Sequence, residues 1–205
     1  MQSRQARPSL IRAGSSLSDV VLVIATALNK EGICAVLTGE GAAAMHTPGG
    51  QLGSRLNYSL TSPATASRLA SAIRHLGFEP ADDGHYRHAD INVVLELIQT
   101  PLTIGRSTVV AQTLQLRHGF VRILSPTDCC REQLLQWQAA EQAGPGMQRA
   151  VNLAKQCEIN MPDMRVWMRQ EGLSSLWPGF KKLVEGNARH AAFAPPAAAR
   201  PSRLR

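Results

Sequence analysis

The sequence has no long run of apolar residues. None reaches the roughly 18 residues that a membrane-spanning helix needs, and the longest candidate, Val20 to Leu28, is bounded by Asp19 and Lys30. The N-terminus carries basic residues but no apolar segment followed by a cleavage site, so no secretory signal is expected. We therefore expect no membrane contact and a cytoplasmic location.

Cysteine is also scarce. The four cysteines form neither a Cys-x-x-Cys pair nor a zinc pattern with the six histidines. They are Cys34, Cys129, Cys130 and Cys157. Reduced thiols in the core of a cytosolic protein are the expected role, and no metal site is expected from them.

Acidic residues are missing from both ends of the chain. Residues 1–16 and 186–205 contain no Asp or Glu, and their seven arginines account for the whole net charge of +7. These are Arg4, Arg7, Arg12, Arg189, Arg200, Arg203 and Arg205. The last segment has the Pro/Ala composition of a disordered chain. Because a globular nucleic-acid binder usually carries its basic face on the fold, we expect solvated tails, with nucleic-acid binding through the arginine tails as an alternative.

Hydrophobic residues make up 44% of the whole chain, enough for the segment between the tails to bury one good core. Helices and strands alternate in its first part, residues 17–124, where apolar spacing and glycine turns mark the boundaries. The pattern predicts helices at 16–32 and 64–76, the second opened by Ser62-Pro63, and strands at 33–37, 57–60, around 78, and at 85–88, 92–98, 108–116 and 120–124.

A second part, residues 125–185, is helical throughout. Ser125, Pro126 and Asp128 form a helix start, with serine as the N-cap, proline at N1 and an acid at N3. Four helices are expected here, the last from Leu173 to Val184 with a break at Pro178-Gly179. The organisation is thus a basic tail (1–16), an α/β domain (17–124), a helical domain (125–185) and a basic tail (186–205).

One motif carries more chemistry than the rest. An apolar strand runs into the glycine turn Gly39-Glu40-Gly41, which opens an alanine-rich helix ending near His46. After a loop, the strand expected at 57–60 presents Asn57 and Ser59 at i and i+2, on one face.

This layout resembles the nucleotidyltransferase superfamily, in the small bacterial and archaeal branch that includes toxin–antitoxin and AbiEii-like proteins. The run from Arg122 to Cys129 (Arg-Ile-Leu-Ser-Pro-Thr-Asp-Cys) is similar to the segment that enters the helical part of those proteins. The resemblance covers Asp19 to Trp177. It implies an α/β (α+β) fold, with a mixed sheet, packed helices and a C-terminal helical bundle.

The resemblance also implies which chemistry is missing. Nucleotidyl transfer uses divalent cations held by an Asp-x-Asp pair and a third carboxylate, and Mg²⁺ prefers anionic oxygen ligands. Asn57 and Ser59 stand in place of the aspartates, and Glu96 corresponds to the third carboxylate. The sequence predicts that Asn57, Ser59 and Glu96 converge on one sheet face near the glycine turn. Magnesium is expected as a cofactor only if the protein is active, and otherwise none.

The glycine turn also departs from the family pattern in a way that disfavours nucleotide binding. In the family, a turn such as Gly39–Gly41 brings backbone N–H groups and a helix N-terminus onto the triphosphate. Glu40 adds a carboxylate beside the phosphates, which would repel a nucleotide. Arg55 and Lys30 are the candidate compensating cations.

Three functions remain open. In the first, the chain is a catalytically silent nucleotidyltransferase-like protein that acts through contact with another protein or in an oligomer, as a regulatory or toxin–antitoxin-type component. Alternatively it is an active metal-dependent enzyme with a rebuilt site using Glu96 and Glu40, or a nucleic-acid adaptor that uses its tails. His85 and His88 are three apart on a strand and face opposite sides, so they do not share a metal.

Overall fold

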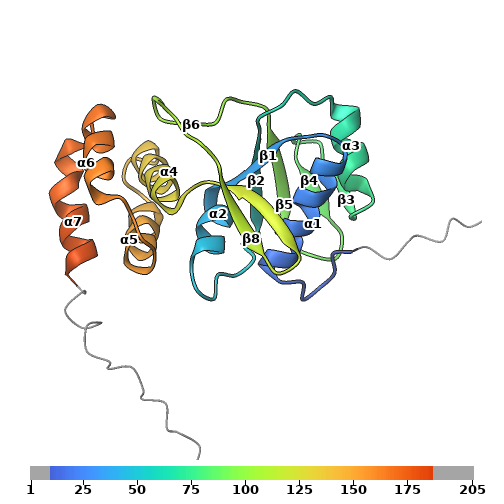
Figure 1. Ribbon diagram of the computed structural model, residues 1–205, viewed down its shortest axis with the longest axis horizontal. Coiled ribbons are helices and arrows are strands. Elements are labelled where there is room, and N and C mark those ends of the chain that lie inside the picture. The colour runs from blue at the N-terminus through green and yellow to red at the C-terminus, as the bar shows by residue number, and fades with distance from the viewer. Residues whose placement is uncertain (1–9, 187–205) are drawn as a thin grey trace, which may run out of the picture.

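The computed structural model describes residues 10–186, and these form an α+β fold with a sheet half and a helical half (Figure 1). The sheet half contains a mixed seven-stranded sheet in the order β3-β4-β5-β2-β1-β9-β8, and a separate β6-β7 hairpin. Its strands are β1 (Ala35–Thr38), β2 (Arg55–Leu60), β3 (Phe78–Pro80), β4 (Tyr86–His88), β5 (Val94–Ile98), β6 (Thr103–Ile104), β7 (Ser107–Thr108), β8 (Gln112–Leu116) and β9 (Gly119–Ile123). Its helices are α1 (Leu17–Lys30), α2 (Gly39–His46) and α3 (Ala66–Arg74).

The core of the sheet half lies between α1 and one face of the sheet. Alternate residues of β2 and β5, including Leu56, Tyr58 and Leu95, are fully buried on this face. The Tyr58 hydroxyl donates a hydrogen bond to the Val21 carbonyl of α1, at 3.2 Å. Because side chains alternate along a strand, the residues between them, including Asn57, point to the opposite face.

Two helix boundaries differ from the sequence prediction. The helix expected from residue 64 begins at Ala66, because Thr65 is the N-cap and accepts the Arg68 N–H. Ser62, expected to open that helix, instead accepts the backbone N–H of Cys34. The break expected at Pro178-Gly179 is also wrong, since α7 (Trp177–Glu185) contains both residues in its first turn. Proline is tolerated there because first-turn N–H groups have no partner within the helix.

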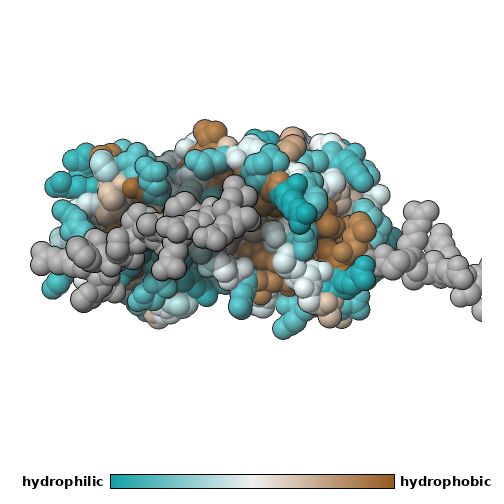
Figure 2. Space-filling view, turned by 60° about the horizontal axis from the view of Figure 1, so that its bottom comes forward, coloured by the Kyte–Doolittle hydropathy of each residue, from teal (hydrophilic) through white to brown (hydrophobic). Residues whose placement is uncertain are grey.

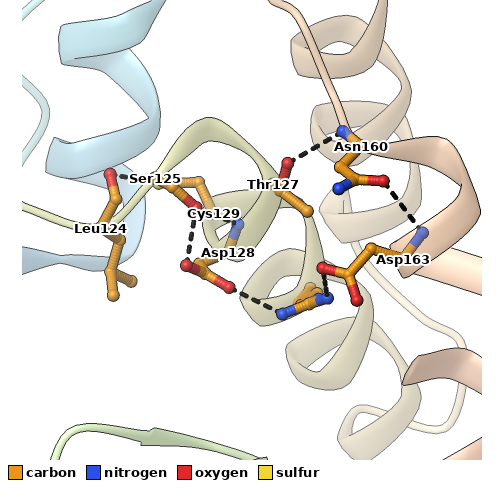
Figure 3. A network of polar contacts seen from close by, with 8 residues as sticks. Leu124, Ser125, Thr127, Asp128, Cys129, Asn160 and Asp163 are labelled. Atoms are coloured by element: carbon orange, nitrogen blue, oxygen red, sulfur yellow. Dashed lines mark hydrogen bonds and ion pairs between the residues drawn. The ribbon is translucent and has the colours of Figure 1, made fainter. Parts of the chain in front are cut away.

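The helical half contains α4 (Pro126–Ala139), α5 (Gly146–Gln156), α6 (Met161–Gln170), the 3₁₀ turn η1 (Ser174–Leu176) and α7. The predicted start of α4 is confirmed: Ser125 Oγ accepts the Asp128 N–H at 3.0 Å and donates to the Asp128 carboxylate at 2.6 Å. Asp128 in turn accepts from Arg131, which also binds Asp163 of α6 (Figure 3). The Arg131 guanidinium lies 5.6 Å from the ring centre of Trp167, so this buried cation joins α4 to α6.

The cysteines divide between the core and the surface. Cys129 and Cys130 are buried in the first turn of α4, and burial raises the pKa of the Cys130 thiol to about 12. Cys34 is exposed, so the expectation of core thiols is wrong for that residue. It follows the buried Ile33 immediately before β1 and therefore points away from the core.

The two tails lie mostly outside the described residues. Of the first tail, residues 10–16 are described, and Ile11 among them is buried in the core. Of the second, Gly186 alone is described. Within residues 10–186, no helix is both long and apolar enough to cross a membrane.

Candidate functional site

A row of polar side chains crosses three neighbouring strands, and continues to the residue just before a fourth, on the face opposite α1. Asn57 of β2 is paired in register with Glu96 of β5 on one side and with Thr38 of β1 on the other. His85, immediately before β4, lies opposite Glu96, and its Nε2 is 3.3 Å from Glu96 Oε1. Residues paired in register share a sheet face. We call Thr38, Asn57, Glu96 and His85 the polar row.

Ser59 lies on the same face but farther along β2. It is paired with Val36 and Ile98 rather than with an acid, and it is 8% exposed. Two residues along a strand span roughly 7 Å. Asn57 is therefore the direct neighbour of Glu96, and Ser59 occupies the next position along the strand.

Glu96 is held by cationic or cation-forming groups on both sides. Arg55 Nη1 lies 3.4 Å from Glu96 Oε2, and His85 contacts the other carboxylate oxygen. His85 Nδ1 also lies 3.2 Å from Asp83 Oδ1, which is within ion-pair distance. The backbone N–H of His85, followed by its ring and by Arg87, lowers the pKa of Asp83 to about 2. Both carboxylate oxygens of Glu96 thus already have a partner within the protein.

Asn57 places an unpaired acceptor in the row. Its Oδ1 is buried and accepts no hydrogen bond from the described residues. Thr38 Oγ1 donates to the Asn57 backbone carbonyl at 3.3 Å, rather than to the side chain. An aspartate at position 57 would place a buried charge beside Glu96, whereas Asn57 presents a neutral amide.

The glycine turn leads from the polar row into α2. Gly39 has φ +65°, a conformation that L side chains rarely adopt, and an added Cβ would lie 3.2 Å from Asn57 Nδ2. Thr38, the N-cap of α2, makes no side-chain capping hydrogen bond. The Gly39 N–H instead donates to Glu132 Oε2 of α4, at 2.7 Å. A carboxylate from the helical half therefore occupies the N-terminus of α2, where the helix dipole favours an anion.

Glu132 is partly buried at this position. Burial raises its pKa to about 7, an effect that the Gly39 hydrogen bond partly offsets and that the nearby Asp128 carboxylate increases. The group therefore titrates near neutral pH. It connects the N-terminus of α2 to α4 and so joins the two halves of the molecule.

Glu40 faces a cleft between α2, the following loop and α5. The cleft has a volume of about 350 Å³, and Glu40, Arg55 and Arg149 are among its lining residues. Arg149 of α5 forms an ion pair with Glu40. The cation that compensates Glu40 is therefore Arg149, while Arg55 binds Glu96 and Lys30 is the last residue of α1.

The sequence placed part of this site and missed the rest. The register puts Asn57, Ser59 and Glu96 on one face, and Gly39 lies against Asn57. His85, Glu132 and Arg149 were missed. The sequence did predict that His85 and His88 lie on opposite faces of the sheet. His88 Nε2 is hydrogen-bonded to the Leu76 carbonyl in the core, whereas His85 contacts Glu96 in the polar row. Within residues 10–186, no group of three or more His, Cys, Asp or Glu side chains is arranged to hold a metal.

The fold is similar to that of solved structures, although the sequence itself matches no protein-family model and no curated protein. A nucleotidyltransferase-like antigenic protein from Paracoccidioides brasiliensis superposes with a TM-score of 0.60 at 15% identity, over 85% of this chain and 94% of that chain. The solution structure of the antibiotic-resistance factor ANT(2'')-Ia gives a TM-score of 0.45 at 12% identity, over 85% of this chain and 96% of that chain. The chain therefore has a nucleotidyltransferase-like fold, and the polar row lies within it.

Proposed function

We propose that this protein is a catalytically silent member of the nucleotidyltransferase-like fold that acts through contacts with another protein, as a regulatory or toxin–antitoxin-type component. The observation that carries the proposal is the pairing of Asn57 with Glu96. Where the resemblance calls for neighbouring carboxylates, one acid faces a neutral amide. Neutral oxygens can contact Mg²⁺ but cannot offset its charge, so this donor set does not fit a two-magnesium centre.

The surroundings of Glu96 support the same proposal. Arg55 and His85 contact both of its carboxylate oxygens. A dication approaching Glu96 would have to displace these partners and would meet the positive charge of Arg55. No second carboxylate in the polar row would compensate that cost.

The glycine turn, where a triphosphate would bind, also supports the proposal of a silent site. The Gly39 N–H already donates to Glu132, so a phosphate would have to compete with an internal carboxylate. Glu40 adds an acid at the adjacent position, paired with Arg149. A triphosphate would therefore have to compete with Glu132 for the Gly39 N–H and with Glu40 for Arg149.

A role in protein contact is supported by the edge of the sheet. β8 is an edge strand of the seven-stranded sheet, and an unpaired strand edge can accept a strand from another chain. Val110, just before β8, is 82% exposed, and Phe120 of β9 is 50% exposed. Figure 2 shows hydrophobic side chains gathered mainly over the sheet half on the face in view.

A transfer assay tests the silent site. The full chain is incubated with each nucleoside triphosphate, labelled at the α-phosphate, with Mg²⁺ or Mn²⁺, and with protein and RNA acceptors. We expect no labelled product above that of a heat-treated control. Transfer that Glu96→Ala abolishes would overturn the proposal in favour of an active, rebuilt enzyme.

The contact role has its own test. A purified protein partner should bind the full chain equally well in EDTA and in Mg²⁺, and Phe120→Glu should weaken the complex. Lys30→Glu, an exposed change on α1, is the matched control. A partner that binds only when magnesium and nucleotide are present would contradict a metal-independent role.

A further inference from the structure

A basic groove lies on the helical half, at the end of the molecule away from the sheet (Figure 1). Two adjoining hollows of about 710 and 650 Å³ share Trp177 and Pro178. Four basic side chains line them, against the one acid Glu185. They are Arg165 and Arg169 of α6 and Lys181 and Lys182 of α7. We call these four residues with Trp177 the basic groove.

The helix geometry explains why these cations gather. Arg165 and Arg169 are four residues apart on α6 and lie on the same side of the helix, and so do Trp177 and Lys181 on α7. All four basic residues are exposed. Their charge is therefore available to a ligand in solution.

The neighbouring acids do little to cancel this charge. Asp163 of α6 is bound to Arg131 in the α4–α6 network. Glu171 turns toward the β6-β7 hairpin, where it accepts the Arg106 N–H at 2.8 Å. Glu185 lies 3.6 Å from Lys181 as an exposed pair, and such pairs are weak and easily exchanged for another anion.

Trp177 supplies a flat surface among the cations. Its side chain is half-buried, and its ring centre lies 6.3 Å from that of the buried Phe180, at 43°. Contact with a core residue restricts the ring without covering it. An aromatic platform beside several cations suits a ligand with a regular negative charge and flat faces.

We propose that the basic groove binds single-stranded nucleic acid, with the phosphates held by the four cations and one base stacked on Trp177. An acidic peptide would satisfy the charge, but it would leave the aromatic surface without a stacking partner. The arginine-rich C-terminal segment follows Gly186, which is one of the residues that line the groove. The groove is separate from the polar row, so this proposal does not depend on whether the polar row is silent.

The test measures fluorescence anisotropy of a labelled 12-nucleotide oligouridylate with the full chain, from 50 to 300 mM salt. The double variants Arg165→Gln/Arg169→Gln and Lys181→Gln/Lys182→Gln should each raise Kd about tenfold or more at low salt. Each should also reduce the slope of log K against log salt by about 1.4, because single-strand binding loses roughly 0.7 per phosphate contact. The matched control, Lys30→Gln/Arg74→Gln, removes two exposed cations from the sheet half and should change Kd less than twofold.

Stacking is tested separately from charge. Trp177→Ala should raise Kd roughly tenfold, while Trp177→Phe should keep most of the affinity. Three results would overturn the proposal: equal losses in the Lys30/Arg74 control, equal affinity for poly-glutamate with no effect of Trp177→Ala, or binding that disappears on removal of residues 187–205 while the groove variants bind like the parent.

Discussion

Glu132→Gln should make the protein more stable above neutral pH and leave it nearly unchanged in mild acid. Glu132 is the partly buried carboxylate that accepts the Gly39 N–H, and its desolvation raises its pKa from the ordinary 4.5 to about 7. Glutamine keeps a carbonyl oxygen for that hydrogen bond but carries no charge. The variant therefore removes the titration while preserving the contact.

The direction in which the free energy of unfolding changes with pH follows from proton binding. Between pH 4.5 and 7, folded Glu132 retains a proton that the unfolded chain has released, so the free energy of unfolding of the parent falls as pH rises through this window and levels above pH 7. At about 1.4 kcal/mol for each pH unit, the fall amounts to roughly 3 kcal/mol. Glu132→Gln lacks this fall, so its advantage over the parent should grow from near zero at pH 4.5 to as much as about 3 kcal/mol at pH 8.

Urea unfolding of both proteins across pH 4.5–8 measures this difference directly, because other titrating groups cancel between them. Glu79→Gln is the matched control: Glu79 is exposed, and its replacement should give a profile parallel to that of the parent. A Glu132→Gln profile that also runs parallel to the parent would refute the reasoning. It would mean that Glu132 is not held as a buried, proton-retaining group at the start of α2.

Three further changes probe the framework of the site. Gly39→Ala should destabilise by about 1–2 kcal/mol, because its φ is +65° and because the added Cβ would lie 3.2 Å from Asn57 Nδ2; urea unfolding should show a smaller loss for Gly49→Ala, which shares the φ cost at +71° but whose added Cβ meets nothing within 4 Å. Arg131→Met should cost about 3–5 kcal/mol by leaving the buried Asp128 carboxylate without its ion-pair partner, whereas Asp163→Asn, at a half-exposed partner, should cost less than about 1 kcal/mol; equal losses would contradict the burial argument. Glu96→Gln should change the free energy of unfolding by less than about 1 kcal/mol, because Arg55 is 51% exposed on its side of the pair; a larger loss on urea unfolding would show that Glu96 is needed for folding.

The sequence could predict the parts of the site that depend on local periodicity. The i, i+2 spacing of Asn57 and Ser59 fixes their common face whatever strand lies beside them. Ser125 and Asp128 define the start of α4 within four residues, and that start is observed. The expectation that Glu96 lies beside Asn57 came only from the family resemblance, and the order of the strands in the sheet was not predicted.

The contacts that close the site could not be predicted in this way. Glu132 and Gly39 are 93 residues apart, and Arg149 and Glu40 are 109 apart. Such contacts depend on how the helical half packs on the sheet half, which no local pattern records. The basic groove was missed for a related reason: a balanced sum of charges between the tails does not show that cations from α6 and α7 gather on one surface.

We propose that the site is silent because its carboxylates are missing, and one titration decides this. Thermal unfolding is followed for the parent and for Asn57→Asp/Ser59→Asp, with each nucleoside triphosphate, in Mg²⁺ and in EDTA. A ligand at 100 times its Kd stabilises a protein by about 2.7 kcal/mol, which is easily detected. The account predicts no magnesium-dependent shift in the parent, a clear upward shift in the double variant, and a double variant less stable than the parent in EDTA because its carboxylates repel one another. A parent stabilised by magnesium and nucleotide together, with the effect lost in Glu96→Ala, would contradict it.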